Sequence, residues 1–255
     1  MSQIVDWGYR PDPVGVVAPS VRDLVVGSTP ATAVSLAPYV ERVRQQRHYS
    51  ACVGCAFAAG IEIRGRVLGT MPASLSETAI WTYARSAGML HTHGRMLPLA
   101  NTGCTPSDAV EGMRTWGLVH ADRWPLGDDT ACSLVPWDVV QGGYDMRFDQ
   151  AYRLGFETRI QELRDSLVAG YPVAFAAKVC AGFLNWRAGS AYDGAVGADK
   201  GWHMMLAVGF DGDNVRVLNS WGEDWCDAGF CWITSRYLAS EFAQDFYAIK
   251  ASVAG

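Results

Sequence analysis

The spacing of apolar residues changes halfway along the chain, and this change limits the folds that it can adopt. In the first half, apolar residues recur at helical intervals in three segments, 52–65, 74–88 and 105–117. A further helical segment at 157–170 is followed by apolar runs that turn residues separate and that predict strands, at 171–179, 203–210, 214–221 and 229–238. Helices and strands are therefore segregated along the chain. This order is typical of an α+β fold with antiparallel strands, not of an alternating β-α-β sheet.

Residues with special backbone preferences set the expected boundaries. Ser74 or Ser76 is expected to cap the second helix, and Gly88 to end it. In the third helix, Thr105 is the expected cap before Pro106, and Gly117 is the expected end. These residue types satisfy or tolerate the backbone groups that a helix leaves unpaired at its ends.

The loops and the first residues show a different pattern. Prolines interrupt residues 1–45, which predicts an irregular lead-in with one short helix within 31–44. The sequence Asp-Gly-Asp-Asn at 211–214 predicts a hairpin turn, and the Gly- and Ala-rich stretch 181–201 predicts a long surface loop.

Composition excludes several classes of protein. Hydrophobic residues make up 49% of the 255 residues and charged residues 18%, which is enough apolar material for a sizeable core. The net charge of −5 gives no basic surface for nucleic acid or anionic membranes, so a cluster at Arg42, Arg44 and Arg47 is expected to be a solvated helix edge. No signal peptide or membrane-spanning run is recognised, so we expect reduced thiols and a cytoplasmic location. Cys226 and Cys231 flank a predicted turn, and their pairing stays open.

Four residues could form a thiol-based catalytic site. Cys52 begins the first helix, His203 begins a strand, Asn219 follows the next strand, and Gln46 precedes Cys52. A helix N-terminus and a nearby imidazolium both favour the thiolate that a cysteine nucleophile requires. An Asn amide oxygen can orient the imidazole, while a Gln side chain and the backbone N–H of the nucleophile can stabilise an oxyanion.

These residues lie in strings that resemble the papain-like cysteine peptidases, in the prokaryotic or viral branch without a long propeptide. The matching pieces run from Gln46 to Leu238: QRHYSACVGCAFAAGIE, SLSETAIW, GCTPSDAVEGMRTWGLVHADRWPL, GYPVAFA, GWHMMLAVGFD and NSWGEDWCDAGFCWI. The resemblance implies a two-lobed fold, with a helical lobe and an antiparallel β-barrel-like lobe. It also implies a thiol protease that cleaves peptide or isopeptide bonds through a Cys52, His203 and Asn219 triad, with Gln46 in the oxyanion hole and without cofactor or metal.

Two cysteines compete for the role of nucleophile. The family places its glutamine six residues before the nucleophile and the Ile-Glu of the helix ten residues after it. Gln46 and Glu62 have this spacing from Cys52 but not from Cys55. We therefore predict that Cys52 is the nucleophile and that Cys55 is a buried, inert thiol.

The chain also departs from the family pattern. Val53 replaces an aromatic residue, and Tyr49 replaces a cysteine, so the disulfide usual at that position cannot form. Trp202 and Met204 flank the histidine, and Met204 is expected to narrow the cleft. Trp221 is expected to pack over Asn219 and shield its hydrogen bond to His203.

The resemblance gives an expected division of the chain. Residues 1–45 form an N-terminal extension that packs on the surface or along the cleft, where it can act as a short autoinhibitor. Residues 46–255 form the peptidase domain, with a helical lobe at about 46–135 and a β lobe at about 136–255.

Other functions stay open at this point. The CVGC sequence at 52–55 suits a redox dithiol only within a thioredoxin-like context, which is not visible. His91 and His93 lack the spacing of a metal site, and no phosphate-binding glycine loop is present. A transglutaminase-like acyl transferase could use the same residues. A silent papain-like module could instead serve a larger assembly such as a virion. The expected partners are protein or peptide substrates, not nucleic acid or membrane, and the location is cytoplasmic or virion-associated.

Overall fold

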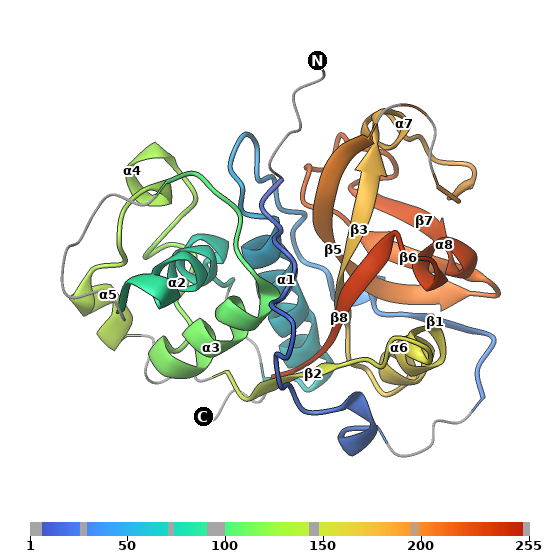
Figure 1. Ribbon diagram of the computed structural model, residues 1–255, viewed down its shortest axis with the longest axis horizontal. Coiled ribbons are helices and arrows are strands. Elements are labelled where there is room, and N and C mark those ends of the chain that lie inside the picture. The colour runs from blue at the N-terminus through green and yellow to red at the C-terminus, as the bar shows by residue number, and fades with distance from the viewer. Residues whose placement is uncertain are drawn as a thin grey trace.

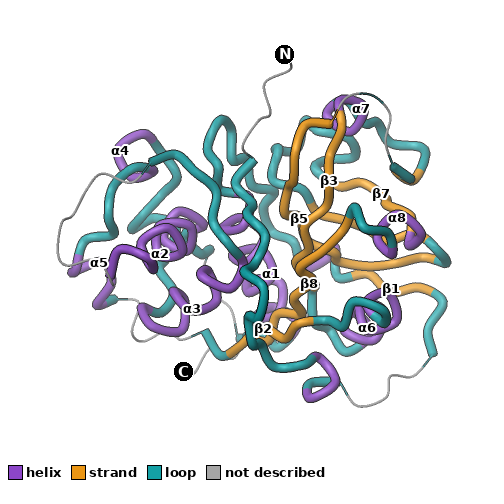
Figure 2. The backbone as a smooth tube through the Cα atoms, viewed as in Figure 1, coloured by secondary structure: helices purple, strands orange, loops and turns teal. Residues whose placement is uncertain are grey.

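The structure is a computed structural model that describes residues 7–25, 30–70, 74–90, 100–142, 148–194, 197 and 199–251, without the side chains of 87–90. The helices are α1 (Cys52–Val67), α2 (Glu77–Leu90), α3 (Pro106–Trp116), α4 (Asp128–Ala131), α5 (Trp137–Gln141), α6 (Arg159–Val168), α7 (Ala181–Leu184) and α8 (Ser235–Ala239), with 3-10 turns at Val21–Asp23 and Ala37–Tyr39. The strands are β1 (Ala33–Ser35), β2 (Gln150–Arg153), β3 (Val173–Cys180), β4 (Ala191–Tyr192), β5 (Asp199–Asp211), β6 (Asn214–Leu218), β7 (Phe230–Thr234) and β8 (Ala243–Lys250). Helices α2 to α5 gather in one lobe, and most strands lie in the other together with α6, α7 and α8 (Figures 1 and 2).

The first helix, α1, lies between the two lobes. Its residues are small or apolar around most of its circumference, as expected for a helix that is buried on all sides. It packs against α2 on one side and against β5 and β8 on the other. This burial fixes the start of α1, where Cys52 lies, against both lobes.

The β lobe is built around the long strand β5. The sheet has the order β2-β8-β3-β5-β6-β7-β4, and β1 also pairs with β5. Neighbouring strands are antiparallel except for β4 and β7, which are parallel. The hairpin predicted at 211–214 is confirmed, because Asp211 pairs with Asn214 at the end of β5 and β6.

Several predicted boundaries are confirmed. Ser76 caps α2, because its Oγ accepts the Ala79 N–H at 2.9 Å. Thr105 caps α3 by accepting the Asp108 N–H at 3.0 Å, and Gly117 ends this helix with a φ of +82°.

Other local predictions are wrong or confirmed only in part. Gly88 does not end α2, which continues to Leu90. The short helix predicted within 31–44 is present, but only as the 3-10 turn Ala37–Tyr39, which contains Pro38; Ala33–Ser35 before it form β1, which pairs with β5. Residues 235–238 leave the strand and enter α8, which Thr234 caps. The stretch 181–201 contains α7, β4 and the start of β5, because β4 pairs with β7 and β5 pairs with β3.

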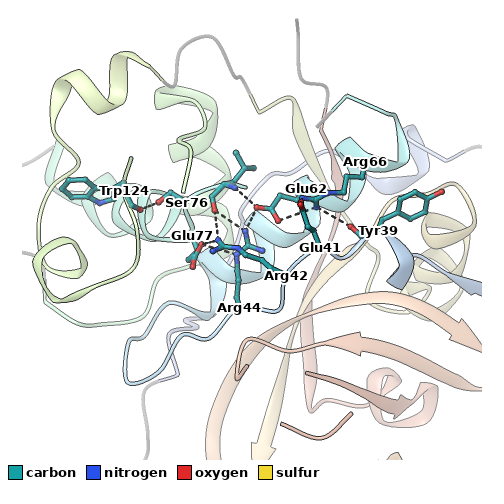
Figure 3. A network of polar contacts seen from close by, with 10 residues as sticks. Tyr39, Glu41, Arg42, Arg44, Glu62, Arg66, Ser76, Glu77 and Trp124 are labelled. Atoms are coloured by element: carbon teal, nitrogen blue, oxygen red, sulfur yellow. Dashed lines mark hydrogen bonds and ion pairs between the residues drawn. The ribbon is translucent and has the colours of Figure 1, made fainter. Parts of the chain in front are cut away.

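A buried ion network joins the segment before α1 to the helical lobe (Figure 3). Arg44 pairs with Glu62 of α1 at 2.5 Å and with Glu77 of α2 at 3.2 Å, while Arg42 pairs with Glu77 at 2.7 Å. The Leu75 carbonyl accepts from both guanidinium groups. The prediction of a solvated helix edge is therefore wrong for Arg44, whose charge is neutralised inside the protein by two carboxylates.

The first described residues run between the lobes, as the blue trace in Figure 1 shows. We call residues 7–13 the strap. On the helical side, the Cys104 N–H donates to the Gly8 carbonyl at 3.0 Å, and the Arg10 N–H donates to the Cys104 carbonyl at 2.9 Å. On the β side, Asp245 accepts from the Tyr9 hydroxyl at 2.5 Å. The strap is thus bonded to both lobes.

Two further features concern the whole described chain. All seven cysteines lie in described segments and form no disulfide, Cys226 and Cys231 included. Among the described residues, no helix is both long and apolar enough to cross a membrane.

Candidate active site

The predicted nucleophile lies at the interface of the two lobes. Cys52 is the first residue of α1, and its side chain is 0% exposed. The Met204 N–H, on β5, donates to Cys52 Sγ at 3.4 Å. Met204 directly follows His203, the predicted catalytic histidine. The contact therefore places the Cys52 thiol beside the backbone next to that histidine.

The predicted histidine and asparagine are directly bonded. His203 Nε2 lies 2.7 Å from Asn219 Oδ1, which also accepts the Ser220 N–H at 2.8 Å. The Trp221 ring stacks on the imidazole, with 4.8 Å between centroids and 25° between planes. His203 Nδ1 is buried and has no hydrogen-bond partner among the described residues. The second ring nitrogen is thus left for a reacting partner, while the first is held by Asn219.

Burial controls the charge of this histidine. His203 is 0% exposed, and loss of hydration lowers its pKa to about 4, although the bond to Asn219 acts in the opposite direction. The imidazole is therefore neutral near pH 7 in this structure. A neutral imidazole gives less stabilisation to a neighbouring thiolate than an imidazolium does.

Gln46 is held so that its amide nitrogen faces the strap. Its Oε1 accepts the Ser220 hydroxyl at 2.6 Å, and its Nε2 donates to the carbonyls of Tyr49 and Trp7, each at 2.8 Å. Ser220 thus bonds to Asn219 through its backbone and to Gln46 through its side chain. Sequence reasoning did not single out Ser220, although it stands within the NSWG string.

The strap covers this cluster. The Trp7 ring lies 5.0 Å from the Trp221 ring and 6.0 Å from His203, and its Nε1 donates to the Lys200 carbonyl at 3.1 Å. Gly8 passes close to residues 47–51, which precede the predicted nucleophile and are here called the nucleophile loop. A Cβ atom on Gly8 would lie 2.1 Å from the Ser50 carbonyl oxygen. From the sequence we expect residues 1–45 to pack on the surface or along the cleft, but the sequence does not identify which residues make the contact, because that depends on tertiary placement.

The remaining predicted site residues lie around the cluster. Trp202 lies 6.0 Å from the Tyr9 ring of the strap. Met204 contributes its backbone N–H to Cys52, while its side chain is buried and lines a small internal cavity with Cys55. Burial, followed by the nearby Glu77, raises the pKa of Cys55, so this thiol is poorly suited to act as a nucleophile.

The arrangement suits acyl transfer by a thiol. It contains a cysteine at a helix start, an imidazole oriented by an amide oxygen, and two candidate oxyanion donors, Gln46 Nε2 and the Cys52 N–H. Within the described residues, no three His, Cys, Asp or Glu side chains are grouped to hold a metal ion. His91 and His93 lie outside those residues.

Comparison with known proteins identifies the family. The family model for papain family cysteine proteases matches residues 33–248. Oryzain gamma chain of Oryza sativa subsp. japonica is 28% identical over 203 residues, which cover 75% of this chain and 51% of that protein. A peptidase C1-like protein of Acanthamoeba polyphaga mimivirus is 29% identical over 187 residues, which cover 66% of this chain and 60% of that protein. The chain therefore spans between half and three-fifths of these curated relatives.

Solved structures show the same fold. Xylellain, a cysteine protease from Xylella fastidiosa, superimposes with a TM-score of 0.79 at 20% identity, over 98% of this chain and 97% of that chain. The bromelain protease of Ananas comosus, in complex with the E64 inhibitor, gives 0.67 at 18% identity, over 87% of this chain and all of that chain. The family match, the two-lobed α+β fold and these neighbours agree, and the chain belongs to the papain family of cysteine proteases.

Proposed function

We propose that this protein hydrolyses peptide or isopeptide bonds, with Cys52 as nucleophile, His203 as acid and base, and Asn219 as the group that orients His203. The observation that carries the proposal is the convergence of three elements on one point. The start of α1 supplies Cys52, β5 supplies His203 and the backbone N–H on Cys52 Sγ, and the end of β6 supplies Asn219 at 2.7 Å from the imidazole.

The proposed reaction has two steps. The Cys52 thiolate attacks the carbonyl carbon, and the oxyanion of the tetrahedral intermediate is stabilised by Gln46 Nε2 and the Cys52 N–H. The C–N bond breaks as the His203 imidazolium gives its proton to the leaving amine, and a thioester remains. Water then attacks the thioester, His203 takes one proton from it, and the carboxylic acid leaves, which restores the Cys52 thiolate and the His203 imidazolium.

We infer that the strap holds the protein in a latent form. The Trp7 carbonyl accepts from Gln46 Nε2, so it uses a donor that the oxyanion would need. The same segment helps to bury His203, whose pKa is about 4 in this state, and so disfavours the thiolate–imidazolium pair. Activity would then require the strap to leave the cleft.

The division of the chain remains a prediction. It assigns residues 1–45 to an extension and residues 46–255 to the peptidase domain, with lobes at about 46–135 and 136–255.

Hydrolysis of a mixed pool of fluorogenic peptides under reducing conditions tests the proposal. The full-length protein with Gly8→Ala, a change that cannot fit under the nucleophile loop, is expected to cleave peptides faster than the unchanged chain. Cys52→Ala in that background should abolish cleavage, while Cys55→Ala should retain it. Cleavage that survives Cys52→Ala would refute the assignment of the nucleophile.

The closed cleft also suits a second candidate, a catalytically silent papain-like module. Cys52 and His203 are both 0% exposed. A binding module can function with both side chains buried, whereas a protease must expose them to its substrate. If Gly8→Ala exposes Cys52 to alkylation but no peptide is cleaved, this second reading is favoured. Product analysis with and without an added amine separates hydrolysis from acyl transfer.

A further inference from the structure

Cys226 and Cys231 stand on opposite sides of a tight hairpin at the start of β7. Asp227 and Phe230 close this hairpin, because the N–H of each donates to the carbonyl of the other at 3.0 Å. The two residues between them have φ angles of +50° and +85°, as a two-residue hairpin turn requires. The two cysteines are the next residues outward from the closing pair, so they face each other across the hairpin.

This position in a hairpin suits a disulfide bond. In an antiparallel pair, the residues next to a hydrogen-bonded pair have Cα atoms only about 4.5 Å apart. A disulfide bond spans Cα atoms that are about 4.4–6.8 Å apart. Cys226 itself has a φ of +51°, so the chain bends there, and Cys226 is the last residue that the hairpin brings opposite β7. We expect rotation of the two side chains to be enough to join their sulfur atoms.

The two thiols influence each other and differ in exposure. Burial raises the pKa of Cys231 well above its ordinary value, and the charge of Cys226 raises this pKa further, which requires the two sulfur atoms to lie near each other. Cys231 is 1% exposed, whereas Cys226 is only partly buried. An oxidant in solution therefore meets Cys226 first, with Cys231 behind it.

The hairpin also supports the proposed catalytic residues. The Gly229 carbonyl, in the turn, accepts the backbone N–H of Asn219 at 2.9 Å. The Trp225 ring, just before the hairpin, packs edge-on against the Trp221 ring with 5.2 Å between centroids, and Trp221 covers the imidazole of His203. A bond between the two cysteines would thus hold the backbone beside Asn219 and the aromatic support of Trp221.

We propose that Cys226 and Cys231 are a redox-modification site, at which a peroxide converts the two thiols into a reversible disulfide that fixes the hairpin. Hydrogen peroxide oxidises the Cys226 thiolate to a sulfenic acid and is itself reduced to water. The Cys231 sulfur then attacks the Cys226 sulfur, the S–S bond forms, and the sulfenic oxygen leaves as a second water. In total, the two thiols lose two hydrogen atoms and one peroxide becomes two waters. The inference is independent of the proposed function, because its readouts are thiol chemistry and unfolding.

Peptide mapping of the full-length protein tests the disulfide directly. The native protein is treated with hydrogen peroxide, denatured, alkylated with iodoacetamide and digested with trypsin, which releases both cysteines in one peptide, residues 217–236. This peptide should lose both labels and be two hydrogen atoms lighter, and dithiothreitol should restore both labels. Cys52, which is 0% exposed, should remain labelled. Retention of both labels after peroxide, or sulfinic acid on Cys226 beside a labelled Cys231, would overturn the inference.

Thermal unfolding tests whether the bond supports the hairpin. Closing a loop of only six residues, 226–231, should raise the Tm of the peroxide-treated protein about 5 °C above that of the reduced protein. Cys226→Ser is the control, because it keeps the size of the side chain but forms no disulfide, so peroxide should not raise its Tm. Cys132→Ser removes another partly buried thiol and should leave the rise intact. A disulfide that forms without this rise, or a rise that Cys226→Ser retains, overturns the inference.

Discussion

Replacement of Gly8 by alanine should open the active site. Gly8 has a φ of +109°, in a region that residues with a Cβ atom rarely adopt. The added Cβ would lie 2.1 Å from the Ser50 carbonyl oxygen and 2.8 Å from the Ala51 nitrogen. Both contacts are with backbone atoms of the nucleophile loop, which cannot rotate away as a side chain could. The substituted strap must therefore move.

The expected size of the effect follows from the backbone conformation. A non-glycine residue in such a conformation costs about 1–3 kcal/mol, before any steric overlap is added. Taking about 2 kcal/mol as the penalty on the strapped state, the ratio of open to strapped molecules should rise about 30-fold. If strap release limits access to Cys52, the alkylation rate should rise by the same factor.

The assay is iodoacetamide alkylation of the reduced full-length protein at pH 7, with the labelled peptide identified by mass spectrometry. Gly15→Ala is the matched control, because Gly15 also has a positive φ, +90°, but has no atom within 4 Å of its would-be Cβ. We expect fast labelling of Cys52 in Gly8→Ala and a rate near that of the unchanged chain in Gly15→Ala. Equal rates in both variants would refute the argument that the strap blocks the nucleophile.

Three further changes test other parts of the site and its support. In the Gly8→Ala protein, Ser220→Ala removes the hydroxyl that donates to Gln46 Oε1, so kcat for peptide hydrolysis should fall about tenfold. The rate of Cys52 alkylation by iodoacetamide should be unchanged, because this reaction forms no oxyanion. Equal losses of the alkylation rate and of kcat would instead indicate general misfolding. Arg44→Leu leaves Glu62 buried without its closest cation and leaves Glu77 paired with Arg42 alone. Urea titration should show a loss of about 3–5 kcal/mol, whereas a loss under 1 kcal/mol would contradict the buried network. Because burial lowers the pKa of His203 to about 4, the folded protein binds fewer protons than the unfolded chain between pH 6.5 and 4. The stability that this neutral imidazole contributes is present above about pH 6.5 and is lost as the pH falls. Urea titrations at pH 7 and 4.5 should show a fall of about 2 kcal/mol that His203→Asn lacks; the same fall in the variant would assign it to other groups.

Local sequence signals predicted the elements that carry the site. The α3 boundaries follow from Thr105, Pro106 and Gly117, whose backbone chemistry acts without tertiary help. The α+β order followed from the change in apolar spacing, and the family strings placed His203 and Asn219 sixteen residues apart. The structure joins these two side chains across neighbouring strands, β5 and β6.

Features that depend on tertiary pairing were not predictable in this way. Gly88 is a common helix terminator, but α2 continues past it to Leu90. Strand β8 was missed because Gln244 and Asp245 interrupt its apolar pattern, although the side chains of both residues bond to the Tyr9 hydroxyl of the strap. The path of the strap depends on bonds from Tyr9 and Asp12 to residues more than 230 positions away, and no local pattern encodes such contacts.

The pH dependence of Cys52 alkylation in the Gly8→Ala protein tests the central claim most directly. With the strap displaced, His203 should regain hydration and pair as an imidazolium with the Cys52 thiolate, so labelling should stay fast down to about pH 5. Adding His203→Ala should abolish the fast labelling between about pH 5 and pH 8 and leave a thiol that is labelled mainly above about pH 8. If Gly8→Ala alone already labels only above about pH 8, Cys52 and His203 do not form the reactive pair, and the proposed peptidase mechanism is wrong.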